Sequence, residues 1–585
     1  MVIERMVERS TLTLYFSCRF QGEVSPMAEI ISAVAPVSPS RVDQMFPILT
    51  PAQLARIEAH GHSRAVKQDE VVVEAGQKVV PFIVVRRGTI DIVQPTRQSE
   101  AHIFTLGPGQ FTGEVNMISG RRTLMGVRAR EAGEIVEMDR EHMLAVVQTD
   151  SELSEILMRA FILRRVNLIA HGLGDVVLLG ANYCAGTLSV KDFLSRNGHP
   201  YQYIDLDRDA DAQTLLDRFD ISPADVPVLI CHGDVVLRNP SNQQIAECLG
   251  FNEAIDQTQV HDVVIIGAGP AGLAAAVYAA SEGLDVLMIE SHAPGGQAGS
   301  SSKIENYLGF PTGISGQALT GRGITQALKF GAKMLIAQGA RKLVCEKRPF
   351  AIEIDGGIRV PARAVIIATG AQYRKPSLEN LMKFEGAGVY YGATFMEAQL
   401  CAGEEIVIIG GGNSAGQAVV FLAQTAKRVI ILLRADGLAQ SMSRYLIRRI
   451  EENPNISLRT RTEVVTVEGG NHLERVSWQN RRTGEIETRD IRHVFIMTSA
   501  IPGTQWLDGC LALDANGFIK TGADLTEEDL ANAHWPLARA PHLLETGLPG
   551  VFAVGDVRAN NIKRVASAVG EGSITVAFVH QVLHE

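Results

Sequence analysis

A single hydrophobic core stops growing at about 250–300 residues, so a chain of 585 residues is expected to contain three or four domains. Hydrophobic residues make up 46% and charged residues 21% of the sequence, as in soluble globular proteins. The net charge of −10 argues against nucleic-acid binding, and no apolar run is long enough to span a membrane. Seven scattered cysteines without a CxxC pair exclude a local zinc knuckle and a disulfide scaffold and favour a reducing cytoplasm, and we predict no metal site.

The first 27 residues differ in character from the rest of the chain. They contain Arg5, Arg9 and an interrupted apolar patch at residues 12–16, and no signal-peptide cleavage site follows the patch. We therefore expect residues 1–27 to be a disordered tail, or an extension upstream of a true start at Met27.

Residues 28–172 form the first predicted domain. A helix is expected over residues 51–59, with Thr50 as its N-cap. Short apolar runs separated by glycine turns follow this helix, which is the pattern of a β-barrel or β-roll. Apolar residues at helical spacing predict one further helix over residues 140–168.

This order of elements, with the string FTGE at residues 111–114, resembles the cyclic nucleotide-binding domain family. The resemblance implies that Glu114 holds a ribose hydroxyl and that an arginine about nine residues later holds the cyclic phosphate, which needs a charge-assisted partner. Here Arg121 and Arg122 come too early, and Thr-Leu stands at residues 123–124. A cyclic nucleotide is therefore one candidate partner of this domain. The alternative is a domain used for packing or dimerisation without a ligand.

Residues 173–256 are expected to form a second domain, with strands over 175–179, 201–206 and 225–230 and helices over 188–197 and 211–219. This order resembles the thioredoxin and glutaredoxin fold. Cys184 falls at the first cysteine of that family's redox pair and Thr187 at the second, and Val226-Pro227 matches its cis-proline turn. A helix N-terminus favours a thiolate, so Cys184 is a candidate catalytic monothiol. A small buried hydrophobe is the alternative interpretation.

A glycine turn opens the third part of the chain. A buried strand over residues 263–266 leads into GxGxxG spacing, an Ala-rich helix and a second strand that ends at Glu290. In such a turn Gly267 permits the tight bend, Gly269 lets a pyrophosphate approach, and Gly272 allows close packing of helix and strand. The helix N-terminus favours phosphate, and Glu290 is positioned to accept hydrogen bonds from a ribose. The predicted dinucleotide site also includes Ala268, Pro270 and Ala271.

A second dinucleotide motif lies at residues 405–415. A strand leads into the turn residues Gly410, Gly412, Asn413, Ser414 and Ala415, and a helix follows. The next strand ends in Arg434, at the position where an acid would favour NAD and a cation suits the 2′-phosphate of NADPH. NADPH is therefore the expected nucleotide, with NADH as the alternative.

Two nested dinucleotide folds and a closing strand–Gly–Asp element at residues 551–556 resemble the low-molecular-weight thioredoxin reductases. The resemblance implies an FAD-binding domain at residues 260–372 and 504–585, with an NAD(P)H-binding domain inserted at residues 373–503. It implies that FAD is held by the first glycine turn and by Glu290, Gly296, Gln297, Asn306, Gly370, Gly555, Asp556, Arg564, Val565 and Ala566. A homodimer is the family expectation.

Thioredoxin reductases carry a CxxC pair just before the second motif, and here Gly392 and Phe395 occupy those two positions. Neither side chain forms a thiolate, so the usual relay from flavin to disulfide is absent, and Cys401 nearby is expected to be structural. Three functions remain open: NADPH-dependent reduction of a disulfide acceptor, reduction of ferredoxin or a quinone, and redox or nucleotide sensing with little turnover. The predicted fold is multidomain, with a β-roll, an α/β thioredoxin-like domain and two nested Rossmann-type domains.

Overall fold

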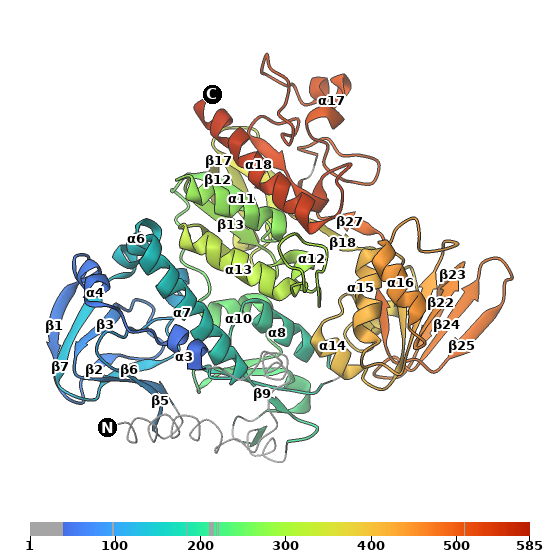
Figure 1. Ribbon diagram of the computed structural model, residues 1–585. Helices are drawn as coiled ribbons and strands as arrows, with labels where there is room; N and C mark the ends of the chain where they lie inside the picture. The colour runs from blue at the N-terminus through green and yellow to red at the C-terminus, as the bar shows by residue number, and fades with distance from the viewer. Residues whose placement is uncertain are drawn as a thin grey trace.

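The computed structural model describes residues 39–585 apart from 96–98, 183, 210–215, 218, 220 and 508. The tail expected at residues 1–27 and most of the helix expected over residues 211–219 lie outside the described residues. Figure 1 shows four bodies: the N-terminal strands in blue at the left, a small green sheet below the centre, a large sheet under green and red helices at the top, and an orange body at the right.

The N-terminal body is a roll of two antiparallel sheets, as expected, with the orders β1-β7-β3 and β2-β6-β4-β5. Its elements are α3 (Pro39–Met45), α4 (Pro51–Glu58), β1 (His62–Val66), β2 (Val71–Val73), β3 (Phe82–Arg87), β4 (Ile90–Pro95), β5 (Glu100–Leu106), α5 (Val115–Ser119), β6 (Gly126–Ala129) and β7 (Gly133–Met138). Thr50 caps α4 through a capping box with Gln53, which confirms the predicted N-cap. Phe82, Phe111 and Phe161 pack together at the centre of its core.

The single helix predicted over residues 140–168 is wrong, because the structure has two helices there. Helix α6 (Arg140–Thr149) ends at Asp150, and α7 (Ser151–Ala170) begins directly after it. The Asp150 carboxylate accepts a hydrogen bond from the Leu153 N–H at 3.0 Å. An aspartate that caps a helix start therefore ends one helix and begins the next, even though the apolar periodicity continues across it.

The second body is a four-stranded sheet in the order β11-β10-β8-β9. Its elements are β8 (Val176–Gly180), α8 (Ala185–Arg196), β9 (Gln202–Asp205), η1 (Pro223–Asp225), β10 (Val228–Cys231), β11 (Val235–Arg238) and α10 (Asn242–Cys248). Strands β8 and β9 are parallel, and β10 is antiparallel to both of its neighbours. The Val226–Pro227 peptide bond is cis, as predicted. Helix α8 starts at Ala185, earlier than predicted, with Cys184 at its N-cap.

The largest sheet has the order β14-β13-β12-β17-β16-β15, with β28 beside β17. Its strands are β12 (His261–Ile266), β13 (Val286–Glu290), β14 (Lys333–Ile336), β15 (Ala340–Val344), β16 (Phe350–Ile354), β17 (Arg359–Ile367) and β28 (Val551–Ala553). Its helices are α11 (Pro270–Ser281), α12 (Gly296–Gly299), α13 (Gly316–Lys329) and α18 (Val565–His584). Strand β28 and α18 come from the end of the chain, and α18 lies against α11 (Figure 1). Segments far apart in sequence therefore build one body.

The nested body contains a parallel sheet in the order β19-β26-β20-β21-β22. Its elements are β19 (Val389–Tyr390), α14 (Phe395–Leu400), β20 (Glu405–Ile409), α15 (Asn413–Leu422), β21 (Arg428–Leu433), α16 (Arg444–Glu452), β22 (Ile456–Thr460) and β26 (Val494–Ile496). A separate antiparallel sheet is formed by β23 (Thr462–Glu468), β24 (Arg475–Asn480) and β25 (Ile486–Arg489). Strands β18 (Ala371–Tyr373) and β27 (Ala500–Pro502) pair with each other and carry the chain out of the large body and back.

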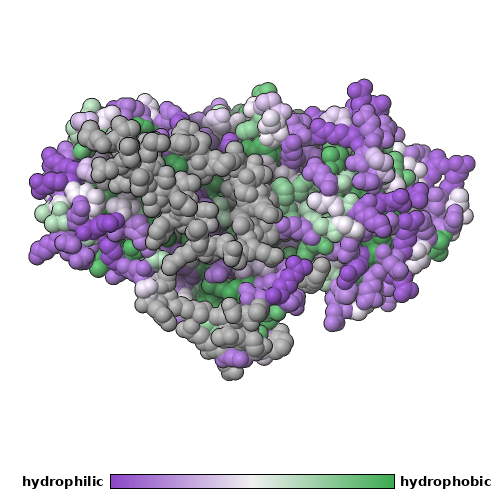
Figure 2. Space-filling view, turned by 60° about the horizontal axis from the view of Figure 1, so that its bottom comes forward, coloured by the Kyte–Doolittle hydropathy of each residue, from purple (hydrophilic) through white to green (hydrophobic). Residues whose placement is uncertain are grey.

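Hydrophilic side chains cover much of the surface at the two ends of the molecule in Figure 2, with smaller hydrophobic areas between them. Within the described part of the chain, no helix combines the length and apolar character needed to cross a membrane.

Candidate functional site

The first glycine turn joins β12 to α11, and its three glycines have different surroundings. Gly267 has φ +104°, and a Cβ there would lie 2.4 Å from the Ala368 carbonyl oxygen. A Cβ at Gly272 would lie 2.0 Å from the Gly267 carbonyl oxygen, so helix and strand pack in direct contact. At Gly269 the nearest atom would be 3.7 Å away. The backbone therefore fixes the outer two glycines, whereas the middle one is partly exposed and its Cβ would make only an ordinary van der Waals contact, with the Gly296 Cα.

Glu290 is the last residue of β13 and lies beside this turn. Its side chain is only 8% exposed, and its two oxygens accept hydrogen bonds from the Ala268 N–H at 2.8 Å and the His292 N–H at 2.9 Å. A buried carboxylate held by two backbone donors has a fixed position. Its remaining lone pairs can accept hydrogen bonds from hydroxyl groups.

Two further segments of the large body meet the glycine turn. Gly296, at φ +55°, starts α12, and a Cβ there would lie 3.0 Å from the Gly269 Cα. Gly555 and Asp556 belong to η6 (Gly555–Val557), after β28, and burial raises the pKa of Asp556 above its ordinary value. The other predicted residues are Gln297 within α12, Asn306 in the loop before α13, Gly370 at φ +63° after β17, and Arg564, Val565 and Ala566 at the start of α18.

Sequence analysis missed Glu571, a residue of α18 that organises the closing strand–Gly–Asp turn. Its carboxylate accepts hydrogen bonds from the Gly555 N–H, the Arg558 guanidinium and the Asn561 amide, each at 2.7 Å. A glutamate in a helix of small residues carries no sequence signal for this role, because its partners come from the preceding loop.

The second glycine turn, between β20 and α15, repeats the first in the nested body. Gly410 has φ +145°, and a Cβ there would lie 2.2 Å from the Met497 carbonyl oxygen. No atom lies within 4 Å of a Cβ built at Gly412, and Ala415 packs against Gly410. Arg434 follows β21 and is exposed. The other turn residues, Asn413 and Ser414, begin α15, where the Asn413 side chain accepts a hydrogen bond from the Ser443 N–H at 2.7 Å.

Gly392 and Phe395, which take the positions of the missing pair, lie where the nested body meets the large one. Ala393 forms a parallel β-bridge with Ser301, and a Cβ at Gly392 would lie 3.5 Å from the Ser300 Cβ. Phe395 instead packs edge to face against Phe421 within the nested body, with ring centroids 4.9 Å apart. Cys401 is fully buried, and burial raises the pKa of its thiol to about 12, which fits the expected structural role.

Cys184 stands at the N-cap of α8, partly exposed, whereas Thr187 one turn later is completely buried. The start of α8 faces the nested body, since a Cβ at Gly386 would lie 2.6 Å from the Ala185 Cβ. Lys191 lies with its ammonium 3.2 Å from the centre of the Tyr203 ring, and burial lowers the pKa of this lysine to about 8. Cys184 is therefore placed at a contact between two bodies.

The other end of α8 reaches the segment 293–296, beside the first glycine turn, through Arg196, which sequence analysis did not single out. Its guanidinium donates hydrogen bonds to the carbonyl oxygens of Ala293 at 2.8 Å, Pro294 at 3.2 Å and Gly296 at 3.0 Å. The Gln317 side chain of α13 also donates to the Ser195 carbonyl at 2.8 Å. A basic residue in the last turn of a helix is common, so only the structure reveals this contact.

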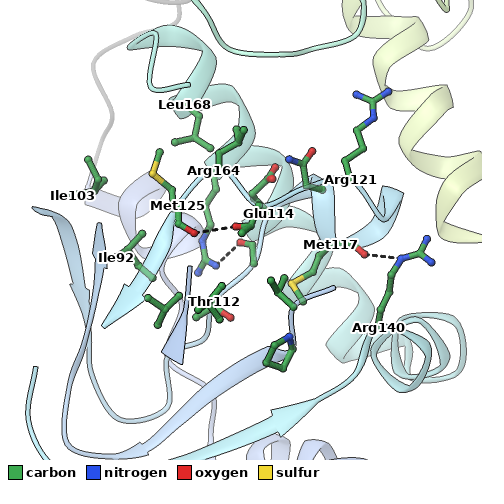
Figure 3. Close-up of a pocket in the computed structure, with 18 of the residues that line it drawn as sticks. Ile92, Ile103, Thr112, Glu114, Met117, Arg121, Met125, Arg140, Arg164 and Leu168 are labelled. Carbon is green, nitrogen blue, oxygen red and sulfur yellow. Dashed lines mark hydrogen bonds between the residues drawn. The ribbon is translucent and has the colours of Figure 1, made fainter. Parts of the chain in front are cut away.

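The β-roll contains a cavity of about 230 Å³ behind α5, shown in Figure 3. Its lining is mostly apolar and includes Phe46, Ile92, Ile103, Phe104, Met125 and Leu168. Glu114, the predicted ribose ligand, forms an ion pair with Arg165 of α7 at 3.3 Å. Arg165 also donates to the Gly198 carbonyl in the second body at 2.8 Å.

The other guanidinium groups around the cavity already have partners. Arg121 donates to the Asn197 carbonyl at 3.1 Å and lies 4.2 Å above the Phe251 ring, and burial lowers its pKa to about 9. Arg164 donates to the carbonyls of Met45 and Gly113, and Arg140 donates to those of Met117 and Ile118. Within the described residues, each arginine that lines the cavity therefore already donates a hydrogen bond to a protein carbonyl.

Comparison with known proteins identifies two regions. The pyridine nucleotide-disulphide oxidoreductase family model matches residues 261–572, and the cyclic nucleotide-binding domain model matches residues 63–150. Thioredoxin reductase from Bacillus subtilis is 32% identical over 333 residues, which are 57% of this chain and 97% of that protein. Thioredoxin reductase from Listeria innocua is 33% identical over 319 residues, 54% and 92% of the two chains. The solved thioredoxin reductase from Lactococcus lactis is 26% identical, with a TM-score of 0.49 over 55% of this chain and 99% of that one.

The two nested glycine-turn bodies therefore define a nucleotide-dependent oxidoreductase. The chain belongs to the pyridine nucleotide-disulphide oxidoreductase family, and within it the last 325 or so residues are of the thioredoxin reductase type. An N-terminal β-roll of the cyclic nucleotide-binding family precedes them.

Proposed function

We propose that the chain is an NADPH-dependent flavoprotein oxidoreductase that binds FAD at the first glycine turn, binds NADPH at the second, and reduces a disulfide. The partly exposed backbone of Gly269, where a Cβ would make only an ordinary contact with Gly296, lies beside the fixed carboxylate of Glu290, and this arrangement is the observation that carries the proposal. Because the flanking glycines are locked by backbone contacts, the turn keeps one shape at the start of α11. That shape suits a pyrophosphate, whose charge a helix N-terminus stabilises.

The residues around this turn would bind and orient FAD, with Glu290 accepting hydrogen bonds from the ribose and Asp556 from hydroxyls of the ribityl chain. Bound FAD and NADPH would supply the redox chemistry, the transfer of a hydride from nicotinamide to flavin. The residues proposed to hold FAD are Gly267, Ala268, Gly269, Pro270, Ala271, Gly272, Glu290, Gly296, Gln297, Asn306, Gly370, Gly555, Asp556, Arg564, Val565 and Ala566.

NADPH would be held by the second turn, through Gly410, Gly412, Asn413, Ser414 and Ala415. The preference for NADPH over NADH rests on Arg434, an exposed cation directly after β21. No hydrogen bond or ion pair occupies its guanidinium within the described residues, so it is available for a 2′-phosphate. A guanidinium pairs well with phosphate because it presents several donors in one plane.

The electron acceptor is proposed to act through the second body, which we infer to be a thioredoxin-like domain. The order β11-β10-β8-β9, with α8 between the parallel strands β8 and β9, supports this inference. The chain contains no CxxC, so a single thiol must act by exchange. The Cys184 thiolate would attack a disulfide, form a mixed disulfide and release one thiol. A hydride equivalent from NADPH and one proton from solvent would then reduce the mixed disulfide to the Cys184 thiol and the second released thiol.

Helix α8 gives this proposal a structural basis, because it spans the distance between the candidate thiol and the candidate flavin site. Cys184 lies at its N-terminal end beside the nested body, and Arg196 at its C-terminal end donates to three carbonyls of the segment 293–296 beside the first glycine turn. A disulfide partner docked at Cys184 would therefore touch a helix whose other end contacts the segment beside the proposed flavin site.

The test uses the full chain with NADPH under anaerobic conditions and a screen of disulfide, ferredoxin and quinone acceptors. We expect NADPH to bleach the flavin and a disulfide to be turned over. The Cys184→Ser variant should lose disulfide turnover by at least about tenfold, the effect of removing an attacking nucleophile, while bleaching persists. Cys248→Ser, a partly exposed thiol of the same body, is the control.

Each outcome bears on a different part of the proposal. A flavin that NADPH does not bleach would contradict the assignment as an oxidoreductase. Turnover of ferredoxin or a quinone without disulfide turnover would exclude the disulfide as acceptor. Full disulfide turnover by Cys184→Ser would make the second body structural, with electrons leaving directly from the flavin site.

A further inference from the structure

Two cysteines that are distant in sequence meet at the edge of the large body. Cys345 directly follows β15, and Cys510 lies after η4 (Gln505–Leu507). Their Sγ atoms are 2.7 Å apart, although 165 positions separate them in the chain. The Cys510 thiol also donates to the Leu343 carbonyl at 3.4 Å, which holds it against the end of β15. The two sulfurs therefore need little movement to reach the bond length of a disulfide, about 2.05 Å.

The pair differs in access from the two buried cysteines of the described chain. Cys345 and Cys510 are both partly exposed at the rim of a hydrophobic cluster, where Trp506 packs beside them. Cys401 and Cys231 are instead completely buried. A small reagent in solution can therefore reach Cys345 and Cys510 without unfolding of the hydrophobic core.

A bond between these two thiols would join two segments with different roles. Strand β15 is the edge strand of the large sheet and pairs only with β16. Helix η4 follows β27, the strand that returns the chain from the nested body. Since β27 and β18 are the connections between the two bodies, a covalent bond at Cys510 would fix the returning segment to the sheet.

We propose that Cys345 and Cys510 form a reversible disulfide by exchange with a low-molecular-weight disulfide. In the first step the Cys345 thiolate attacks the small disulfide, forming a mixed disulfide and releasing one small thiol. In the second step the Cys510 thiolate attacks the Cys345 sulfur and releases the other small thiol. In total two protein thiols and one small disulfide give one protein disulfide and two small thiols. The site requires neither flavin nor nicotinamide, so it stands independently of the proposed function.

The order of the two steps follows from the surroundings of the thiols. Burial and the neighbouring Cys345 raise the pKa of Cys510 to about 12, so this thiol is almost entirely protonated near neutral pH. Because the Cys510 thiol also donates its hydrogen to the Leu343 carbonyl, Cys345 is assigned as the residue that attacks the external disulfide. The closing step is intramolecular, and the short distance between the sulfurs gives Cys510 a high effective concentration at its target.

The experiment treats the full chain with oxidised glutathione or with dithiothreitol, blocks free thiols by alkylation, and maps peptides without reduction. We expect a peptide pair joined through Cys345 and Cys510 after glutathione treatment only. Cys345→Ser should abolish the linked pair, and Cys510→Ser should trap glutathione on Cys345. Peptide mapping is needed because Cys231 also lies in hydrogen-bond contact with Cys248.

Thermal unfolding gives a second measurement on the same samples. The oxidised wild type should unfold at a temperature several degrees above the reduced one, and the two Cys→Ser variants should show no such difference. Cys401→Ser should behave as wild type in the peptide map. Glutathione attached separately to both cysteines, or no linked peptide while other cysteines are modified, would overturn the proposal.

Discussion

The glycine turn after β12 and the segment after Gly113 in the β-roll belong to families that bind nucleotide phosphates, but they use their polar groups differently. At the glycine turn, the nearest atom to a Cβ on Gly269 is 3.7 Å away, and Glu290 is fixed by backbone donors alone. In the β-roll, Glu114 is paired with Arg165, and Arg121 donates to a carbonyl of the second body. At the first site the fixed carboxylate has no ion-pair partner among the described residues, whereas the charged groups of the second are paired with protein groups.

This difference shows that a motif defines which groups are present and that neighbouring elements decide whether those groups are available. The glycine turn is local, because its strand, turn and helix are consecutive in sequence. The β-roll site depends on α7 and on the second body, which supply Arg165, Asn197 and Phe251. Benzene fills an apolar cavity of about 150 Å³. A purine cyclic nucleotide has roughly three and a half times as many non-hydrogen atoms as benzene and needs a correspondingly larger cavity. The 230 Å³ cavity is thus small for that ligand.

The largest expected effect comes from a substitution that blocks the proposed pyrophosphate site at the first glycine turn. The substitution Gly269→Val would place a branched side chain where the pyrophosphate is proposed to lie, at a cost of about 3 kcal/mol or more, which is roughly a hundredfold in FAD affinity. The purified variant should be colourless. Flavin absorbance per mole of protein measures this, with Gly321→Val as control, since a Cβ at Gly321 in α13 meets no atom within 4 Å. Normal flavin content in Gly269→Val would contradict the FAD assignment.

A smaller effect is expected from removing Arg434, whose guanidinium makes no hydrogen bond or ion pair within the described residues. Removing Arg434 should cost about 1.5–3 kcal/mol of phosphate binding, or roughly ten- to hundredfold in the KM for NADPH. The KM for NADH should change little, because NADH lacks the 2′-phosphate. Steady-state kinetics with both nucleotides compare Arg434→Ala with Arg428→Ala, an exposed arginine at the other end of β21. Equal losses with NADPH and NADH would refute the specificity.

The smallest expected effect is a gain in the affinity of the β-roll for a cyclic nucleotide when an arginine is introduced at residue 123. Wild-type protein should bind cyclic nucleotides only weakly, since its arginines are engaged elsewhere. Thr123→Arg supplies a guanidinium at the position where the family has one, and one charge-assisted hydrogen bond of about 1.5 kcal/mol would tighten binding roughly tenfold. Calorimetric titration with a cyclic nucleotide measures the gain, with Thr123→Gln as a long uncharged control. Tight binding by the wild type would show that the ion pair of Glu114 opens for ligand.

Much of the fold was predictable because its signals are local. Thr50 caps α4 as predicted, and the strand β12 with its three glycines forms the expected turn. The helix break at Asp150 was missed, although its cause is also local, because apolar periodicity on both sides outweighed a single capping residue.

By itself, the amino-acid sequence determined the class of this protein, since two glycine turns follow buried strands and each lies within one short stretch of chain. Only the tertiary structure decided which charged side chains are already paired with protein groups and which thiols lie next to each other. Arg196 of the second body holds the segment 293–296 of the large one, and Cys345 meets Cys510 although the whole nested body lies between them in sequence. The physical reason is that such contacts join segments whose separation in sequence carries no periodic pattern, so they arise only when the sheets and helices pack together.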